Sequence, residues 1–173
     1  MDKETLFKEI RQGRTLLWAG AGFSRYAGYP MGPGVVEKLY EELSKAQREE
    51  LAASLQQKKP KCPDWTLPKF AQYFVDLHHG NRTRLIEILD NIFSAEPTRI
   101  DVHEKLARLT FINHIVTTNY DPLFELAYRP SRIQVVEQAS QIPQIGNKEV
   151  ALYKIHGQPS NPDSIIITAR QVG

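Results

Sequence analysis

The sequence predicts an α/β fold in which a parallel sheet is flanked by helices. Unbroken apolar runs, typical of strands buried on both faces, stand at Thr15–Ala19 and Ile115–Thr118. The residues between these two runs follow helical periodicity instead. We therefore expect a Rossmann-like parallel sheet with a helical insert at about residues 34–110, all within one domain spanning residues 1–173.

Each element has its own local signal. A helix over Lys3–Ile10 is indicated by apolar residues four apart, and Gly13 ends it. Asp101 and Glu104 resemble a capping box at the start of a later helix. The further helices expected are Val35–Lys45, Phe70–Leu77, Leu85–Ile92, Asp101–Leu109 and Pro122–Tyr128. In the first of these, Glu41 and Lys45 are expected to form a pair on the outer face. The full set of further strands comprises Ile133–Val136, Ala151–Ile155 and Ile165–Thr168, and loops are expected at Lys58–Pro63 and Gln141–Lys148.

Composition excludes several classes of protein. Lysine and arginine number 22 against 20 acidic residues, and the charges are interspersed, so no dedicated nucleic-acid-binding face is indicated. A single cysteine, Cys62, excludes an intrachain disulfide and a zinc site built on two or more cysteines. No signal peptide is evident, and no apolar run approaches the roughly 20 residues of a membrane span. We expect a cytoplasmic protein.

Motifs for common catalytic chemistries are missing. The sequence has no HExxH, no EF-hand loop, no GxSxG elbow and no Walker A loop. Among the histidines, His78 and His79 indicate a solvated helix end, and His103 and His114 are interpreted as structural. No metal requirement is expected.

Three apolar strands end in small or polar residues, and ligands bind beyond the carboxyl ends of such strands. The first is followed by Gly20-Ala21-Gly22 and Ser24, which could approach a phosphate or could form only a tight turn. The second ends at Thr118 and continues into Asn119 and Asp121, of which Asp121 could also cap the next helix. The third leads to His156 and Gly157, where the histidine could act as a general base or be a hydrogen-bonded side chain.

Taken together, the segments GAGFS, TTNYD and KIHG, with Gly28-Tyr29-Pro30 after the first, resemble the sirtuin-like (silent-information-regulator) family. The resemblance runs from about Thr15 to Thr168. It is especially similar to the bacterial branch that serves anti-phage defence by destroying NAD.

The resemblance implies a Rossmann-like NAD site and a role for each motif residue. Gly20, Ala21, Gly22 and Ser24 would hold the dinucleotide phosphates, and Asn119 and Asp121 would face the nicotinamide ribose. Thr118 and Gly157 would also bind the cofactor, with Gly157 leaving room for the ribose. Asn119 and His156 would be the catalytic pair, with His156 as the base. The implied activity is that of an NAD glycohydrolase, with NAD as substrate, and an oligomer or a regulatory partner is expected to restrain it.

The sequence departs from protein-deacylating sirtuins in ways that weaken an acyl-lysine substrate. A small domain with four zinc-binding cysteines is impossible with Cys62 alone, and the second motif has Thr118 where those enzymes commonly have glutamine. Only 16 residues follow Gly157, so we hypothesise that the chain is a fragment. An NAD-dependent deacylase or ADP-ribosyltransferase, and a non-catalytic module that senses NAD or ADP-ribose, remain alternatives.

Overall fold

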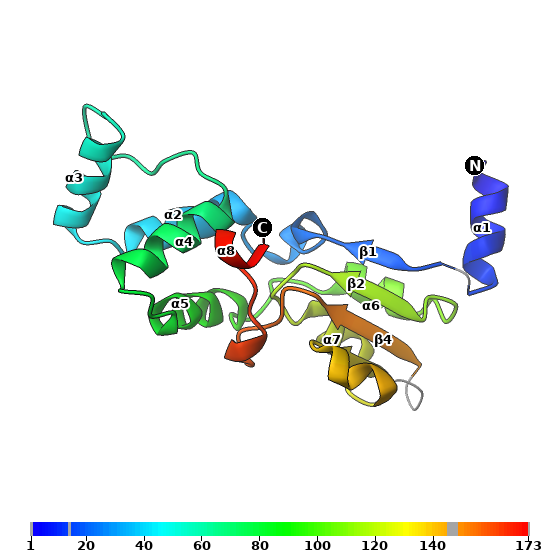
Figure 1. Ribbon diagram of the computed structural model, residues 1–173. Coiled ribbons are helices and arrows are strands. Elements are labelled where there is room, and N and C mark those ends of the chain that lie inside the picture. The colour runs from blue at the N-terminus through cyan, green and yellow to red at the C-terminus, as the bar shows by residue number, and fades with distance from the viewer. Residues whose placement is uncertain (1, 14, 145–148, 173) are drawn as a thin grey trace. The chain divides into compact units, whose positions relative to one another are not determined.

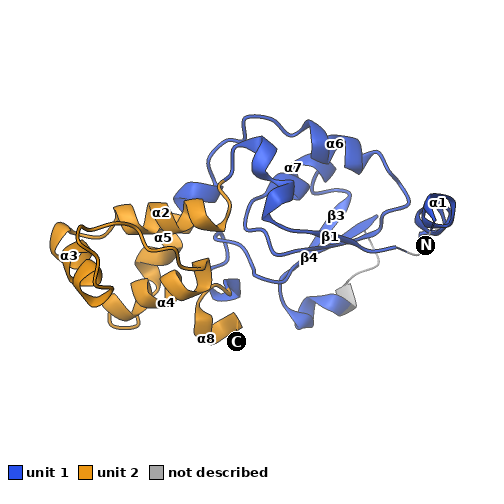
Figure 2. Cartoon of the chain, turned by 90° about the horizontal axis from the view of Figure 1, so that it is seen from above, with its two compact units in different colours: residues 1–29, 90–165 blue, residues 30–89, 166–173 orange. Residues whose placement is uncertain are grey.

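The structure is a computed structural model that describes residues 2–13, 15–144 and 149–172 (Figure 1). The chain divides into two compact units, Met1–Tyr29 with Asp90–Ile165, and Pro30–Leu89 with Ile166–Gly173 (Figure 2). The predicted single domain with an insert at 34–110 stays a prediction. No helix in the described ranges is long and apolar enough to cross a membrane.

The first unit contains a four-stranded sheet in the order β1-β2-β4-β3, with every neighbouring pair parallel. The strands are β1 (Leu17–Ala19), β2 (His114–Thr117), β3 (Ile133–Val136) and β4 (Val150–Lys154). Leu17 pairs with Ile115, so the two apolar runs are neighbours in one sheet as predicted. This confirms the α/β, Rossmann-like parallel sheet flanked by helices.

One face of this sheet forms the core beneath α6 (Asp101–Ala107) and α7 (Leu123–Tyr128) (Figure 2). Ile115 and Leu152 are fully buried there against Phe124 and Tyr128. Trp18 alternates to the other face of β1 and is 63% exposed. The unit also contains α1 (Lys3–Arg11) and four 3₁₀ helices: η1 (Ala21–Phe23), η2 (Arg25–Ala27), η3 (Ala139–Gln144) and η4 (Pro162–Ser164).

The second unit is helical. It contains α2 (Gly32–Glu41), α3 (Lys45–Ser54), α4 (Leu67–Leu77), most of α5 (Thr83–Phe93) and α8 (Ala169–Val172). Its core includes the fully buried side chains of Leu39, Phe70, Leu85 and Leu89. The helices predicted around Phe70–Leu77 and Leu85–Ile92 are confirmed, and α4 ends before Gly80, which has a φ of 85°.

Two helix predictions are wrong. The predicted helix from Val35 to Lys45 is two helices, because Ser44 forms a capping box with Gln47 and starts a new one. Glu41 and Lys45 therefore lie on different helices and do not form the predicted pair. The capping box at Asp101 is also absent, because Asp101 is inside the helix and its carboxylate accepts hydrogen bonds from Arg99.

The predicted strand at Ile165–Thr168 is wrong as well. Ile165 and Ile167 are buried and Ile166 is half-buried, so the segment shows the alternation typical of a strand. It nevertheless pairs with no strand among the described residues, because it follows η4 and leads directly into α8. Of the predicted loop Gln141–Lys148, residues 141–144 belong to η3, and 145–148 lie outside the described residues.

Candidate functional site

Parallel pairing brings the three motifs to one edge of the sheet. β1 and β4 both pair with β2, so the residues after Ala19, Thr117 and Lys154 leave the sheet side by side. The backbone N–H of Thr118 donates to the carbonyl of Ala19, and that of Ile155 donates to the carbonyl of Thr117. The candidate site is therefore a property of strand order, assembled from segments about 100 and 40 residues apart in sequence.

Asn119 connects the second motif to the first. Its Nδ2 donates to the carbonyl oxygen of Gly20 at 3.1 Å and to the Oγ of Ser24 at 2.9 Å. The side chain is 5% exposed, and its Oδ1 is buried without a hydrogen-bond partner in the described part of the chain. A buried acceptor without a partner is uncommon in native proteins and marks a place where a ligand or water can donate.

Ser24 and Asp121 complete this cluster. The Ser24 hydroxyl, 2% exposed, donates to the Asp121 carboxylate while accepting from Asn119. Burial raises the pKa of the Asp121 carboxyl above its ordinary value, an effect opposed by the Ser24 hydrogen bond, the Leu123 N–H and the charge of Lys154. Phosphate binding by Ser24 stays a prediction, and a phosphate there would compete with both of its present partners.

Asp121 also has the structural role considered for it. Its Oδ1 accepts from the backbone N–H of Leu123 at 3.3 Å, at the first residue of α7. The helix-capping role considered for Asp121 is therefore observed, and its role in binding a ligand stays a prediction.

The glycines of the first and third motifs differ in what they require. A Cβ built on Gly157, which has a φ of 72°, would lie 2.2 Å from the carbonyl oxygen of Ser164, so only glycine fits. Gly20 and Gly22 have no such constraint: the nearest contact to a Cβ on Gly20 is Thr118 Oγ1 at 4.0 Å, and nothing lies within 4 Å at Gly22. The backbone at Gly20 and Gly22, on either side of Ala21, is thus not crowded by neighbouring atoms.

His156 lies in the turn after β4 and is half-buried. Its ring centroid is 6.3 Å from that of Tyr120, the neighbour of Asn119. Burial lowers the pKa of His156 below its ordinary value, so the imidazole is neutral near pH 7 and able to accept a proton. Within the described ranges, no hydrogen bond joins His156 to Asn119 directly.

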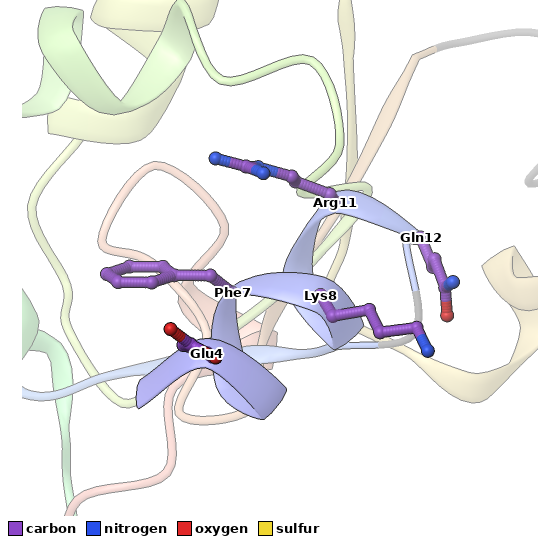
Figure 3. Close-up of a pocket in the computed structure, with 5 residues that line it drawn as sticks. All are labelled: Glu4, Phe7, Lys8, Arg11 and Gln12. Atoms are coloured by element: carbon purple, nitrogen blue, oxygen red, sulfur yellow. The ribbon is translucent and has the colours of Figure 1, made fainter. Parts of the chain in front are cut away.

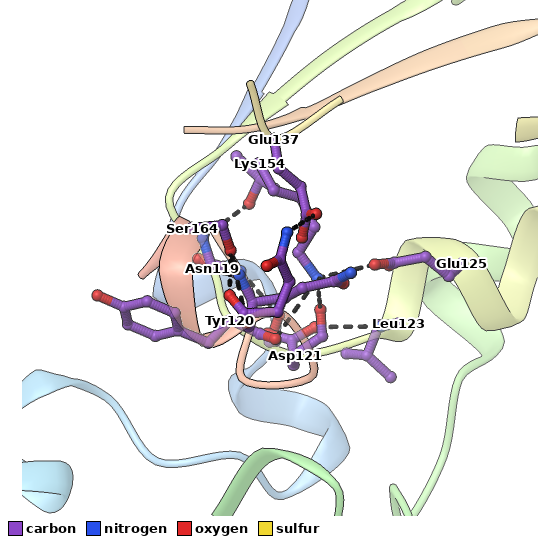
Figure 4. Close-up of polar contacts among 12 residues, drawn as sticks. Asn119, Tyr120, Asp121, Leu123, Glu125, Glu137, Lys154 and Ser164 are labelled. Atoms are coloured by element: carbon purple, nitrogen blue, oxygen red, sulfur yellow. Dashed lines mark hydrogen bonds and ion pairs between the residues drawn. The ribbon is translucent and has the colours of Figure 1, made fainter. Parts of the chain in front are cut away.

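Sequence reasoning missed two polar residues that organise this site. The Oγ1 of Thr117 donates to the carbonyl of Ala19 at 3.0 Å and accepts from the N–H of Asn119 at 3.0 Å. Lys154 is 1% exposed, and its Nζ contacts both the Asn119–Asp121 segment and Glu125 (Figure 4). A signal for Lys154 existed: it shares its strand face with Leu152, a position predicted to be buried.

Two other histidines, His103 and His114, have structural contacts. His103 is fully buried, with its Nδ1 2.8 Å from the hydroxyl of Tyr26, and burial lowers its pKa to about 4. His114 is exposed and lies 3.3 Å from the hydroxyl of Tyr153. No group of three potential metal ligands occurs among the residues described.

A cavity of about 450 Å³ lies along α1 (Figure 3). It is lined by Glu4, Phe7, Lys8, Arg11 and Gln12. None of these residues belongs to the candidate site.

The parallel sheet and the three motifs at its carboxyl end are similar to those of a sirtuin-like domain, and comparison with known proteins agrees. Residues 113–172, which contain TTNYD and KIHG, match the family model of the SIR2-like domain. This match shows that the C-terminal part of the chain is similar to the SIR2-like domain.

The most similar relatives include three bacterial proteins named NAD(+) hydrolase ThsA. The chain is 30% identical to that of Enterococcus faecium over 97% of this chain and 34% of the relative. It is 31% identical to that of Acinetobacter baumannii (strain 532279) over 97% and 32%, and 27% identical to that of Bacillus cereus (strain MSX-D12) over 92% and 31%. The chain thus spans about a third of the length of the curated relatives it matches.

Proposed function

We propose that this chain is an NAD glycohydrolase, which cleaves NAD with water to give nicotinamide and ADP-ribose. The observation that carries the proposal is Asn119: its Nδ2 is fixed by the Gly20 carbonyl and Ser24, while its Oδ1 is buried without a partner in the described chain. An amide held in this way presents one acceptor in a set direction. The names of the relatives support NAD as the molecule placed against it.

The residues of the first motif fit a dinucleotide. Gly20 and Gly22 lack a side chain although neither internal packing nor a left-handed φ requires glycine there. A ligand that lies close to the backbone would explain why glycine stands at both positions, because a pyrophosphate is bound most closely where no Cβ intervenes. We assign Gly20, Ala21 and Gly22 to the NAD phosphates.

Cleavage of the nicotinamide–ribose bond expels a neutral leaving group through an oxocarbenium-like state, so the leaving group needs no proton. The protein must position the ribose and a water, and accept the proton that the water or a ribose hydroxyl loses. Asn119 Oδ1 can accept a hydrogen bond from either donor and hold it in place. Thr118, Asp121 and Gly157 are assigned to the ribose end of the site.

His156 is proposed as the group that accepts this proton. It lies on the turn after β4, beside the strand that carries Asn119, and its lowered pKa keeps the imidazole neutral at pH 7. A general base requires this state, and its contribution is typically about 100- to 10,000-fold.

NAD depletion in anti-phage defence is the biological role we propose, on the sirtuin-like motifs and on the NAD(+) hydrolase relatives. An enzyme that destroys a central cofactor has to be restrained until it is needed. We therefore propose that a homo-oligomer or a regulatory protein or domain controls it, in the cytoplasm.

The test is mass spectrometry of NAD incubated with the chain, with and without an acylated peptide. We expect nicotinamide and ADP-ribose without peptide, unchanged by a metal chelator, and loss of both products in Asn119→Ala and His156→Ala. His114→Ala is the matched control, because His114 is exposed at the opposite end of β2 and should not affect turnover. Peptide-dependent release would indicate a deacylase, and NAD binding without turnover a sensing module; either result would contradict the proposal.

A further inference from the structure

Lys154 is an ammonium buried at the carboxyl end of β4, 1% exposed. Its Nζ donates to the carbonyl oxygens of Asp121 at 2.9 Å and Tyr120 at 3.4 Å, to Glu125 Oε1 at 2.8 Å and to Gln158 Oε1 at 3.3 Å (Figure 4). A buried charge is tolerated only with this kind of full hydrogen bonding.

These acceptors come from two segments that the candidate site needs. Tyr120 and Asp121 directly follow Asn119, and Gln158 is two residues after His156. In the described chain no hydrogen bond joins Asn119 to His156. The ammonium of Lys154 is thus a side-chain link that connects the Asn119 segment with the His156 turn, beside the backbone bond from Ile155 N–H to the Thr117 carbonyl.

Stability alone does not account for a lysine at this position. Replacing a buried ion pair by apolar residues of similar volume is often neutral or stabilising. Lys154 shares its strand face with Leu152, which is fully buried, so an apolar side chain would suit the core. What an apolar side chain could not do is hold the Tyr120 and Asp121 carbonyls.

We propose that Lys154 is a positioning residue for NAD cleavage, which holds the Asn119 segment and the His156 turn at a fixed separation through its buried hydrogen bonds. This inference rests on the proposed function for its link to turnover. The link between the two segments itself rests only on the contacts of Nζ.

The experiment compares Lys154→Met with the double variant Lys154→Met/Glu125→Met. The single variant leaves the partly buried Glu125 without its cation and is expected to be much less stable. The double variant removes both charges and should be more stable than the single variant, although the Tyr120 and Asp121 carbonyls lose their ammonium donor. Its kcat for nicotinamide release should nevertheless be about 10- to 100-fold lower, because small displacements of catalytic groups have effects of this size. Its KM for NAD should stay within about threefold, because the phosphate-binding backbone at Gly20–Gly22 is unchanged.

A matched control is Arg132→Met/Glu149→Met, which removes another 2.8 Å ion pair of the same unit, between the start of β3 and the start of β4. It should change neither kcat nor KM. Hydrogen exchange, read on peptides covering 118–121 and 155–158, should accelerate about tenfold or more in the Lys154/Glu125 double variant and stay unchanged in the control.

A folded double variant with wild-type kcat, or with unchanged exchange in both segments, overturns the proposal. If the wild-type chain cleaves no NAD, the proposed function is wrong. The exchange measurement then still decides whether Lys154 fixes the two segments.

Discussion

Replacing Asn119 by aspartate tests the arrangement at the centre of the candidate site. The substitution keeps the shape of the side chain and turns the donor Nδ2 into an oxygen. The Gly20 carbonyl, now 3.1 Å from Nδ2, would face an acceptor, while the Ser24 hydroxyl could turn its proton toward the new carboxylate. The Gly20 carbonyl keeps its bond from the N–H of Phe23, but it loses the Asn119 donor, and the new buried carboxylate competes with Asp121 for the Ser24 proton; together these changes cost about 2 kcal/mol or more.

The assay is urea unfolding of Asn119→Asp beside Asn113→Asp, in which an exposed asparagine just before β2 undergoes the same chemical change. We expect a loss of about 2 kcal/mol in the free energy of unfolding for the first and less than about 0.5 kcal/mol for the second. Nicotinamide release by the folded Asn119→Asp protein should fall at least about 100-fold, because the amide no longer fixes the turn at Gly20. Equal stability of the two variants would show that Nδ2 does not make these bonds.

Three further predictions follow from the same geometry. Because burial lowers the pKa of His156 below 6.5, the acidic limb of kcat/KM should lie below pH 6.5, and a limb above this value would contradict its assignment as the base. Gly157→Ala should lower the free energy of unfolding by more than about 2 kcal/mol, whereas Gly22→Ala should cost less than about 1 kcal/mol in the same urea titration. His103 has a folded pKa of about 4 against 6.5 when exposed, so the unfolded chain takes up its proton first. Its stabilising contribution is complete above pH 6.5 and lost as the pH falls toward 4, by about 3 kcal/mol; urea unfolding of a His103→Phe variant should lack this part of the pH dependence.

Strands were the most predictable part of the fold. The apolar runs before Gly20 and before Asn119 identified two neighbours in the sheet. The expected burial on both faces holds for Ile115–Thr117 of β2 and is wrong for β1, where Trp18 is 63% exposed. The prediction at Ile165–Thr168 failed because apolar residues also alternate there: Ile165 and Ile167 are buried and Ile166 is half-buried, although the segment is not part of the sheet in the described residues. The alternation of apolar residues indicates which side chains are buried, and it does not indicate whether the segment joins a sheet.

Helix boundaries depended on local competition that periodicity does not contain. The stripe from Val36 to Leu43 continues in phase, yet the first helix ends at Glu41. Ser44 starts another helix because its side chain and that of Gln47 satisfy free N–H groups of the new first turn. At Asp101 the opposite occurred, since Arg99 engages the carboxylate that the capping box needed. Both outcomes are set by side chains within three residues of the boundary.

The position of the candidate site was predictable, and its internal connections were not. Motif residues from three strands were expected at one sheet edge, and the order β1-β2-β4 places them there. The sequence could not indicate that Ser24 would be taken up by Asn119 and Asp121, because this contact depends on the turn after β1.

The same connections explain why the motif residues form a unit. Ser24 joins the amide of Asn119 to the carboxylate of Asp121, and Thr117 joins the backbone of β1 to that of Asn119. Lys154 then holds the carbonyl that follows, so the second motif is fixed from both neighbouring strands. In the Asn119 amide, Nδ2 is therefore bonded to the protein. The Oδ1 of the same amide has no protein partner in the described chain. An amide whose Nδ2 is bonded to the protein and whose Oδ1 is not is suited to hold a hydroxyl or a water in place. Ribose cleavage without proton donation to the leaving group requires such an acceptor.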